Sequence, residues 1–106
     1  MIVDIRTYTT QPGKAQLWLE IYQHYAWPLQ QKYLGDCVGF YVTAEGRLNQ
    51  IVHIWRYESQ ADREARRGAL LKDPAWAVFM EKSAQSGYLL AQENSLARPT
   101  SFFAAS

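Results

Sequence analysis

The sequence predicts an α+β domain of the ferredoxin-like type, in which an antiparallel sheet carries both helices on one face. Segments that alternate in polarity like strands and segments with helical spacing follow one another in the order β, α, β, β, α, β. This is the order of the split βαβ motif. The chain has 106 residues and shows no repeat or interdomain linker, so it fits one domain covering residues 1–106.

The first strand is expected over residues 2–9, which alternate strictly. Val3 and Ile5 lie on one side of the strand, and Asp4, Arg6 and Tyr8 lie on the other, because successive side chains of an extended chain point to opposite faces. The strand therefore has an aliphatic face and a polar-aromatic face.

A long helix is expected next, from about residue 14 to residue 34, where apolar residues recur at helical spacing. Pro28 lies inside this helix and has no backbone N–H, so we expect a kink or break near Trp27. Gly35 follows the last apolar residue and suits a C-terminal cap. The spacing also predicts that the aromatic side chains of the helix belong to the core, namely Trp18, Tyr22 and Tyr25.

A hairpin follows, with strands over residues 38–43 and 49–58 and a turn at 44–47. The second of these strands has the sequence NQIVHIWRYE and again alternates. Val52 and Ile54 form its aliphatic row, and the opposite row contains His53, Trp55 and Tyr57.

The last part of the chain is predicted to be helical and then extended. Ser59 begins a capping pattern for a second helix. Asp73 can cap a fresh turn that Pro74 opens, and Gly87 ends the helical part. Residues 88–97 form the last strand candidate.

The two faces of the sheet are assigned from these rows. The aliphatic rows suit the side covered by helices, so the polar-aromatic rows are expected on the uncovered side, where a second copy of the chain would cover them. A pocket between sheet and helices would invert this assignment.

The composition favours a domain that associates with itself. Hydrophobic residues make up 48% and aromatic residues 14% of the chain. A small monomer can bury only part of so large an aromatic surface in its own core. The formal net charge is +1 and provides no field that would recruit nucleic acid or anionic lipid. We expect a homodimer or higher homo-oligomer, with neither nucleic acid nor membrane as partner.

Cysteine, histidine and targeting patterns point to a cytoplasmic protein without a metal site. Cys37 is the only cysteine, so no intrachain disulfide and no zinc site with paired thiolates is possible. His24 and His53 do not form a helical ligand pair. No apolar segment approaches the ~20 residues that span a bilayer, and we expect no signal peptide or Arg-rich leader.

Several segments together resemble the NIPSNAP family, in the same order along nearly the whole chain. They are Ile5-Arg-Thr-Tyr-Thr9, Pro12-Gly-Lys14, Val38-Gly-Phe40, Leu48-Asn-Gln-Ile-Val-His-Ile-Trp55, Ala61-Asp-Arg63, Asp73-Pro-Ala-Trp76, Gln92-Glu-Asn94 and Arg98-Pro-Thr100. The resemblance implies a ferredoxin-like subunit that pairs sheet to sheet as a dimeric α+β barrel. Larger animal relatives look associated with mitochondria, whereas this chain looks like a short, cytosolic member. The resemblance does not imply a particular reaction.

Two functions are consistent with the polar-aromatic rows. The first is a small-molecule pocket, with an arginine to hold an anion, a histidine or tyrosine to exchange a proton and a tryptophan to stack on a planar ring. It predicts a cavity of some hundreds of Å³. The second is a purely structural or interaction module with a filled barrel. The candidate ligand-binding residues are Arg6, Tyr8, His53, Trp55 and Tyr57.

Three further readings remain open. Arg63, Arg66 and Arg67 could grip an anion, although a solvated basic face is favoured. If the chain is an enzyme, the barrel relatives imply a cofactor-independent oxygenase or isomerase. We predict no cofactor, with haem bound by either histidine as the alternative that the barrel relatives imply.

Overall fold

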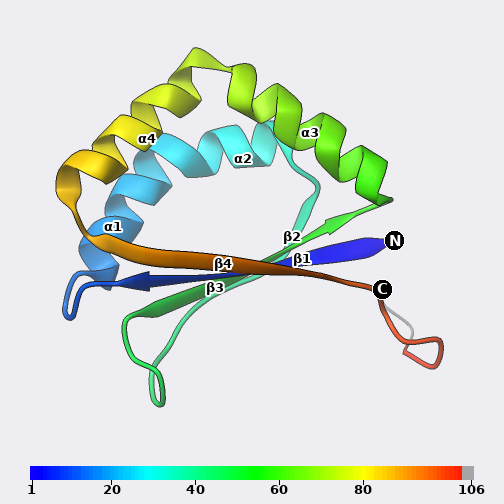
Figure 1. Cartoon of the computed structure of the whole chain (residues 1–106), viewed down its shortest axis with the longest axis horizontal. Helices are drawn as coiled ribbons and strands as arrows, with labels where there is room; N and C mark the ends of the chain where they lie inside the picture. The colour runs from blue at the N-terminus through cyan, green and yellow to red at the C-terminus, as the bar shows by residue number, and fades with distance from the viewer. Residues whose placement is uncertain (104–106) are drawn as a thin grey trace.

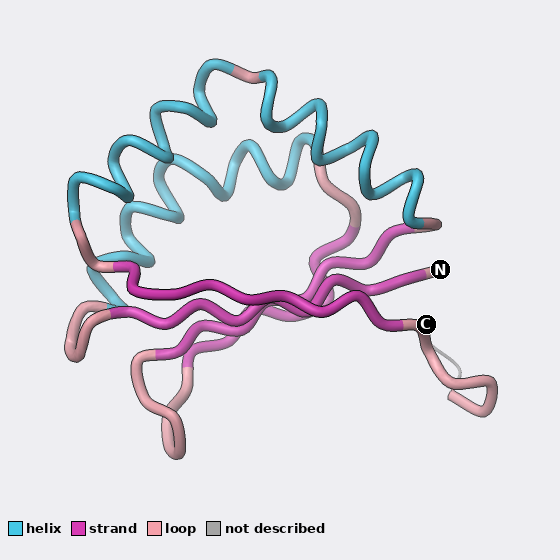
Figure 2. The backbone as a smooth tube through the Cα atoms, viewed as in Figure 1, coloured by secondary structure: helices cyan, strands magenta, loops and turns pink. Residues whose placement is uncertain are grey.

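The computed structural model describes residues 1–103 of the chain. Four strands form one antiparallel sheet in the order β2-β3-β1-β4, which confirms the ferredoxin-like prediction. All helices of residues 1–103 lie over the same face of this sheet, and none of them covers the other face (Figure 1 and Figure 2). The elements are β1 (Ile2–Thr10), α1 (Ala15–Ile21), η1 (Tyr22–Ala26), α2 (Trp27–Tyr33), β2 (Asp36–Val42), β3 (Gln50–Tyr57), α3 (Gln60–Lys72), α4 (Pro74–Ser86) and β4 (Leu89–Ala97).

The first helical region is continuous but contains one wide turn. The segment η1 is a π-helix, and at its end the backbone N–H of Trp27 donates to the carbonyl of Tyr22, five residues earlier. Pro28 follows directly at the start of α2 and has no N–H to donate to His24. The irregularity predicted near Trp27 is confirmed, and its form is a π turn.

Both predicted caps on the second helical region are present. The side chain of Ser59 accepts a hydrogen bond from the backbone N–H of Asp62 at 3.0 Å, and the side chain of Asp73 accepts one from Ala75 at 2.9 Å. These bonds satisfy N–H groups that the first helical turn leaves free. Gly87 ends α4 with a φ of 67°, as expected for a glycine cap.

Gly35 is required for close approach rather than for a left-handed cap. A Cβ atom at this position would overlap the backbone oxygen of Arg56. The loop from α2 to β2 therefore passes directly against β3, and no larger residue fits there without moving the backbone.

The assignment of the two sheet faces from sequence was wrong. The polar-aromatic row faces the helices, where His53, Trp55 and Tyr57 are buried together with Asp4 and Tyr8. The aliphatic row lies on the open face and is only partly buried, and its members include Val3, Ile5, Val52 and Ile54. The helices contribute large aromatic side chains to the core, and these pack against the rings of the polar-aromatic row rather than against the aliphatic row.

Aromatic contacts between sheet and helices build the main core. Tyr8 packs edge-on against Trp18 with ring centroids 5.5 Å apart, and Phe79 of α4 lies edge-on to Tyr22 at 6.0 Å. Offset and edge-on contacts of this kind stabilise a core beyond the burial of area. A second cluster contains Leu34, Trp55, Tyr57 and Leu70.

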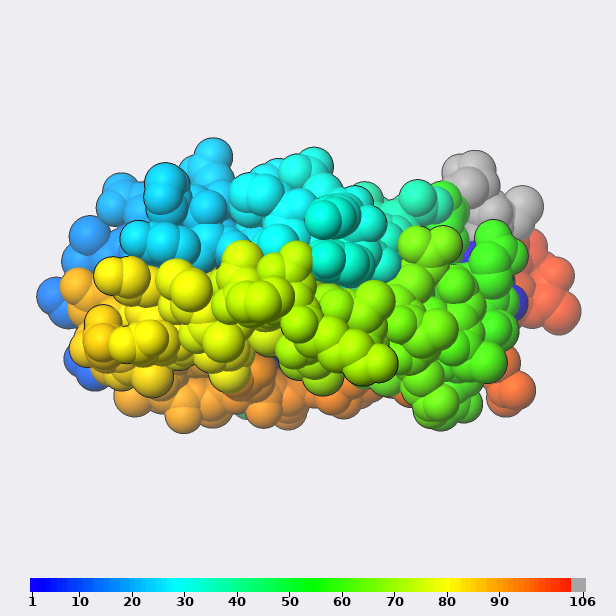
Figure 3. All heavy atoms as spheres, turned by 90° about the horizontal axis from the view of Figure 1, so that it is seen from above, coloured from blue at the N-terminus to red at the C-terminus, as the bar shows by residue number. Residues whose placement is uncertain are grey.

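The two helical regions lie side by side over the sheet, with α1, η1 and α2 in one row and α3 and α4 in the other (Figure 3). Contacts between η1 and α4 and between α2 and α3 join the two rows. Within residues 1–103, no helix has the length and apolarity needed to cross a membrane.

Candidate functional site

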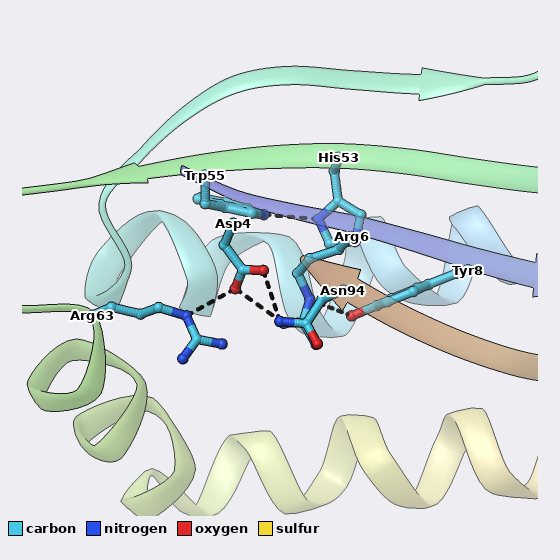
Figure 4. A network of polar contacts seen from close by, with 7 residues as sticks. All are labelled: Asp4, Arg6, Tyr8, His53, Trp55, Arg63 and Asn94. Atoms are coloured by element: carbon cyan, nitrogen blue, oxygen red, sulfur yellow. Dashed lines mark hydrogen bonds and ion pairs between the residues drawn. The ribbon is translucent and has the colours of Figure 1, made fainter. Parts of the chain in front are cut away.

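A buried carboxylate organises the polar end of the helix-covered face. Asp4 of β1 has no exposed surface. Its oxygens accept hydrogen bonds from Arg6 at 3.1 Å, from Arg63 of α3 at 3.0 Å and from Asn94 of β4 at 3.0 Å (Figure 4). Burial alone would raise the pKa of Asp4, but these donors and charges outweigh it and hold the pKa below its ordinary value.

Arg6 connects this carboxylate to the aromatic core. Its Nη1 binds Asp4, while its Nε donates to the hydroxyl of Tyr8 at 3.1 Å. The antiparallel register of β1 and β3 places Arg6 opposite His53, and the ring of Tyr8 lies edge-on to that histidine at 4.8 Å. The two strands therefore bring one cation, one phenol and one imidazole together.

His53 is a neutral side chain with a fixed tautomer. It is fully buried and its Nδ1 accepts a hydrogen bond from Nε1 of Trp55 at 2.8 Å. Burial, with a smaller effect from the positive charge of Arg6, lowers the pKa of His53 to about 3. Because Nδ1 is the acceptor, the hydrogen of the neutral ring lies on Nε2.

A cavity of about 160 Å³ lies between the helices and the sheet beside this network. Its positively charged lining residues are Arg6 of β1 and Arg67 of α3. Its aromatic lining residues are Tyr8, Trp18, Tyr22, Trp76 and Phe79. It is smaller than the some hundreds of Å³ expected from sequence.

Polar atoms without a partner mark this interior. The hydroxyl of Tyr22, Oε1 of Gln30, Nε2 of His53 and the hydroxyl of Tyr57 are buried and have no hydrogen-bond partner within residues 1–103. Tyr22 and Gln30 both line the cavity and are only 3% exposed. Burying a polar group without a partner costs free energy, so a molecule that supplied partners in the cavity would recover this cost.

The sequence favoured exposure to solvent for three basic residues of α3, namely Arg63, Arg66 and Arg67. Only one of them is exposed. Arg66 is exposed and pairs with Asp62 four residues earlier at 2.9 Å. Arg63 instead pairs with buried Asp4, and Arg67 lines the cavity. Arg63 and Arg67 are four residues apart and so share the face of the helix that is turned to the sheet.

The five predicted ligand-binding residues all lie on the helix-covered face, but they do not all reach the cavity. Arg6 and Tyr8 are on its wall. His53 and Trp55 form a hydrogen-bonded pair in the core, and Tyr57 packs in the second aromatic cluster. The site also contains residues outside these five, namely Asp4, Tyr22, Gln30, Asn94 and Arg67. Of these, only Arg67 was considered from sequence as a possible anion contact.

His53 does not suit the role of axial ligand in the haem alternative. His53 is enclosed in the core, stacked on Phe40 with centroids 4.6 Å apart, and the cavity of about 160 Å³ is far smaller than a porphyrin. His24 is exposed. Among residues 1–103, no cluster of three or more His, Cys, Asp or Glu side chains that could hold a metal ion is present.

Comparison with known proteins identifies a family. The family model described as NIPSNAP matches residues 3–104. The chain is 35% identical over 81 residues to a NipSnap homolog of Dictyostelium discoideum, covering 76% of this chain and 35% of that protein. It is 29% identical over 101 residues to human NipSnap homolog 3A, covering 95% of this chain and 40% of that protein. The chain thus matches only about a third of the length of these curated relatives.

Solved structures share the whole fold. A NIPSNAP domain protein of Burkholderia xenovorans, described as uncharacterized, superposes with a TM-score of 0.90 at 31% identity, covering 99% of this chain and 100% of that chain. A putative antibiotic biosynthesis monooxygenase of Nitrosomonas europaea superposes with a TM-score of 0.65 at 10% identity, covering 93% and 98%. The second likeness concerns the fold alone. The matched family model and the relatives agree, and the chain belongs to the NIPSNAP family.

Proposed function

We propose that the chain binds a small molecule with a single ring in the cavity between its helices and its sheet. The observation that carries this proposal is the pair of buried polar atoms without partners on the cavity wall, the Tyr22 hydroxyl and Oε1 of Gln30. A ring with polar substituents would satisfy such atoms and stack on the aromatic wall.

The volume of the cavity supports a ligand of this size. An engineered apolar cavity of about 150 Å³ in another protein holds one benzene molecule, and the cavity here has about 160 Å³. A fused or multi-ring compound would require the helices to move.

Two matched substitutions test whether the Tyr22 hydroxyl lacks a partner in the unliganded protein. Tyr22→Phe is expected to leave the free energy of unfolding unchanged or slightly higher, because the hydroxyl is buried without a partner within residues 1–103. Tyr8→Phe removes the hydrogen bond from Arg6 and is expected to cost about 1 kcal/mol. Chemical denaturation of both variants measures the difference, and equal losses would contradict the assignment.

Ligand binding itself is tested with phenol, benzamide and benzoate as probes. At least one is expected to bind with one site per chain, to shift the indole signals of Trp18 and Trp76 in NMR spectra, and to bind more weakly to Tyr22→Phe. Both indoles belong to residues that line the cavity. No saturable binding of any probe at millimolar concentration would overturn the proposal.

Binding is favoured over proton transfer by the state of the titratable groups. Protonating His53 at Nδ1 requires breaking its hydrogen bond with Trp55, and burial raises the pKa of Tyr22 above its ordinary value. The enzymatic alternative, a cofactor-independent oxygenase or isomerase, has the fold likeness as its only support. Turnover of a bound phenol would establish that alternative.

We further propose that the open face of the sheet pairs with the same face of a second copy. Val3, Ile5, Val52 and Ile54 form an aliphatic surface there that no helix of residues 1–103 covers. Two such faces are self-complementary, as a two-fold dimer requires. The half-buried lone thiol of Cys37 fits a reducing compartment, and we place the dimer in the cytoplasm.

The substitution Ile54→Asp is expected to dissociate the dimer, weakening association at least 100-fold, because it buries an unpaired charge in the centre of the paired sheets. Sedimentation velocity at micromolar concentration measures the oligomeric state. Val78→Asp is the matched control, since Val78 is an apolar residue that is 44% exposed on α4. A monomeric parent protein, or an Ile54→Asp variant that remains dimeric, would refute this interface.

A further inference from the structure

The arginine at position 67 is placed to meet a ligand rather than a protein carboxylate. Arg67 lies one helical turn after Arg63 on α3 and lines the cavity beside Arg6. Arg63 and Arg6 both bind Asp4. None of the ion pairs and side-chain hydrogen bonds within residues 1–103 involves Arg67.

The charges around the cavity do not balance. Among residues 1–103, the charged side chains that line the cavity are Arg6 and Arg67, and no carboxylate lines it. The carboxylate of Asp4, which lies beside the cavity, is already paired with Arg6 and Arg63. Burial lowers the pKa of Arg67, and the positive charge of Arg6 lowers it further. Both effects disfavour the charged form of Arg67 in the unliganded protein, so an anion bound in the cavity would stabilise that charged form.

We infer that the ligand of the cavity is a single-ring carboxylate whose carboxylate group is held by Arg67 and Arg6. This inference rests on the proposed function and adds the charge and the class of the ligand. A guanidinium and a carboxylate can form two parallel hydrogen bonds.

The Tyr22 hydroxyl and the aromatic lining of the cavity favour an aromatic carboxylate over other anions. The Tyr22 hydroxyl stays protonated, since burial raises its pKa, and it can therefore donate to an oxygen of the anion. Trp18, Trp76 and Phe79 provide ring faces and edges on the same wall. A water molecule could satisfy the polar atoms, but only an anion also compensates the charge of Arg67.

The test compares benzoate, benzamide and acetate by isothermal titration at fixed ionic strength. Benzoate and benzamide have nearly the same shape and differ in charge, whereas acetate has the charge without the ring. The unmodified protein is expected to bind benzoate about 10- to 100-fold more tightly than benzamide, the gain typical of a charge-assisted hydrogen bond. Acetate is expected to bind at least 10-fold more weakly than benzoate.

Variants of Arg67 assign the preference. Arg67→Gln is expected to bind benzoate and benzamide equally and to unfold at the same or a higher temperature than the parent. Arg67→Lys keeps the charge without the planar fork and is expected to retain part of the preference. Arg47→Gln, which removes a charge from an exposed loop residue, is expected to retain all of it.

The outcomes separate this inference from the proposed function. If benzamide binds as tightly as benzoate, or Arg67→Gln keeps the preference, the carboxylate class is wrong while the pocket stands. If acetate binds as tightly as benzoate, the site takes a small anion and the ring is not recognised. If none of these probes binds and phenol does not bind either, the proposed function fails together with the inference; if only phenol binds, the inference alone fails.

Discussion

Replacing Asp4 with asparagine is expected to lower the free energy of unfolding by about 3–5 kcal/mol, the usual cost of removing one member of a buried ion cluster. The amide has the shape of the carboxylate but cannot compensate Arg6 and Arg63, whose side chains are only 13% and 16% exposed. Urea unfolding at neutral pH and one fixed protein concentration measures the loss.

Asp36→Asn is the matched control for this experiment. It also removes the carboxylate of an arginine pair, with Arg56 at 2.9 Å, but the Asp36 side chain is 73% exposed. Exposed pairs contribute about 0–1 kcal/mol. A loss of less than about 1 kcal/mol in Asp4→Asn, or equal losses in the two variants, would show that the cluster of Asp4, Arg6 and Arg63 contributes little to the stability of the fold.

The stability of the protein is expected to fall by about 2–3 kcal/mol between pH 6.5 and pH 4.5 because of His53 alone. The folded protein keeps His53 neutral, with a pKa lowered to about 3, whereas the unfolded chain takes up the proton near pH 6.5. Since the unfolded state then binds more protons, acid favours unfolding. Asp4 adds to this loss only at lower pH, because its pKa is held below its ordinary value.

Unfolding free energies measured across this pH range test the effect. His53→Asn is expected to flatten the slope, and its amide oxygen can still accept from Trp55. His24→Asn, at the exposed histidine, is the matched control for the substitution itself. A parent protein with constant stability from pH 6.5 to pH 4.5 would show that His53 is not held neutral by the core.

The elements of the fold were predictable because their signals are local. Ser59, Asp73 and Gly87 are cap residues whose side chain or φ angle acts within one turn, and Pro28 disturbs the helix at its own position. The alternation of β1 and β3 likewise identified two rows of side chains. Each of these signals can be read without knowledge of the tertiary contacts.

The identity of the covered sheet face was not predictable from the same signals. Alternation defines two rows but does not say which one the helices meet, and the aliphatic row is the usual choice. Here Trp18 and Tyr22 meet the aromatic row, and Asp4 can be buried because Arg63 reaches it from an element 59 positions away in sequence. Such compensation appears only once the chain is folded.

The residues that surround the cavity were predictable in part. Arg6 and Tyr8 stood out because a cation and a phenol alternate on one strand. The sequence showed Arg63, Arg66 and Arg67 as one basic group, but which of these side chains meets solvent and which meets the sheet depends on how α3 docks. Gln30 had no signal, since a buried glutamine on a helix looks like any exposed one in sequence.

The wide turn at η1 controls the angular phase between α1 and α2. A π-helical turn accommodates an additional residue, and one residue of an α-helix corresponds to a rotation of about 100°. Trp18 lies before the turn and Gln30 after it, and both are buried. They lie on the same side of the helical region because the wide turn takes up the additional residue between them. Shortening the segment by one residue would swing one of these side chains out to solvent, so the length of this stretch is constrained even where its side chains are exposed.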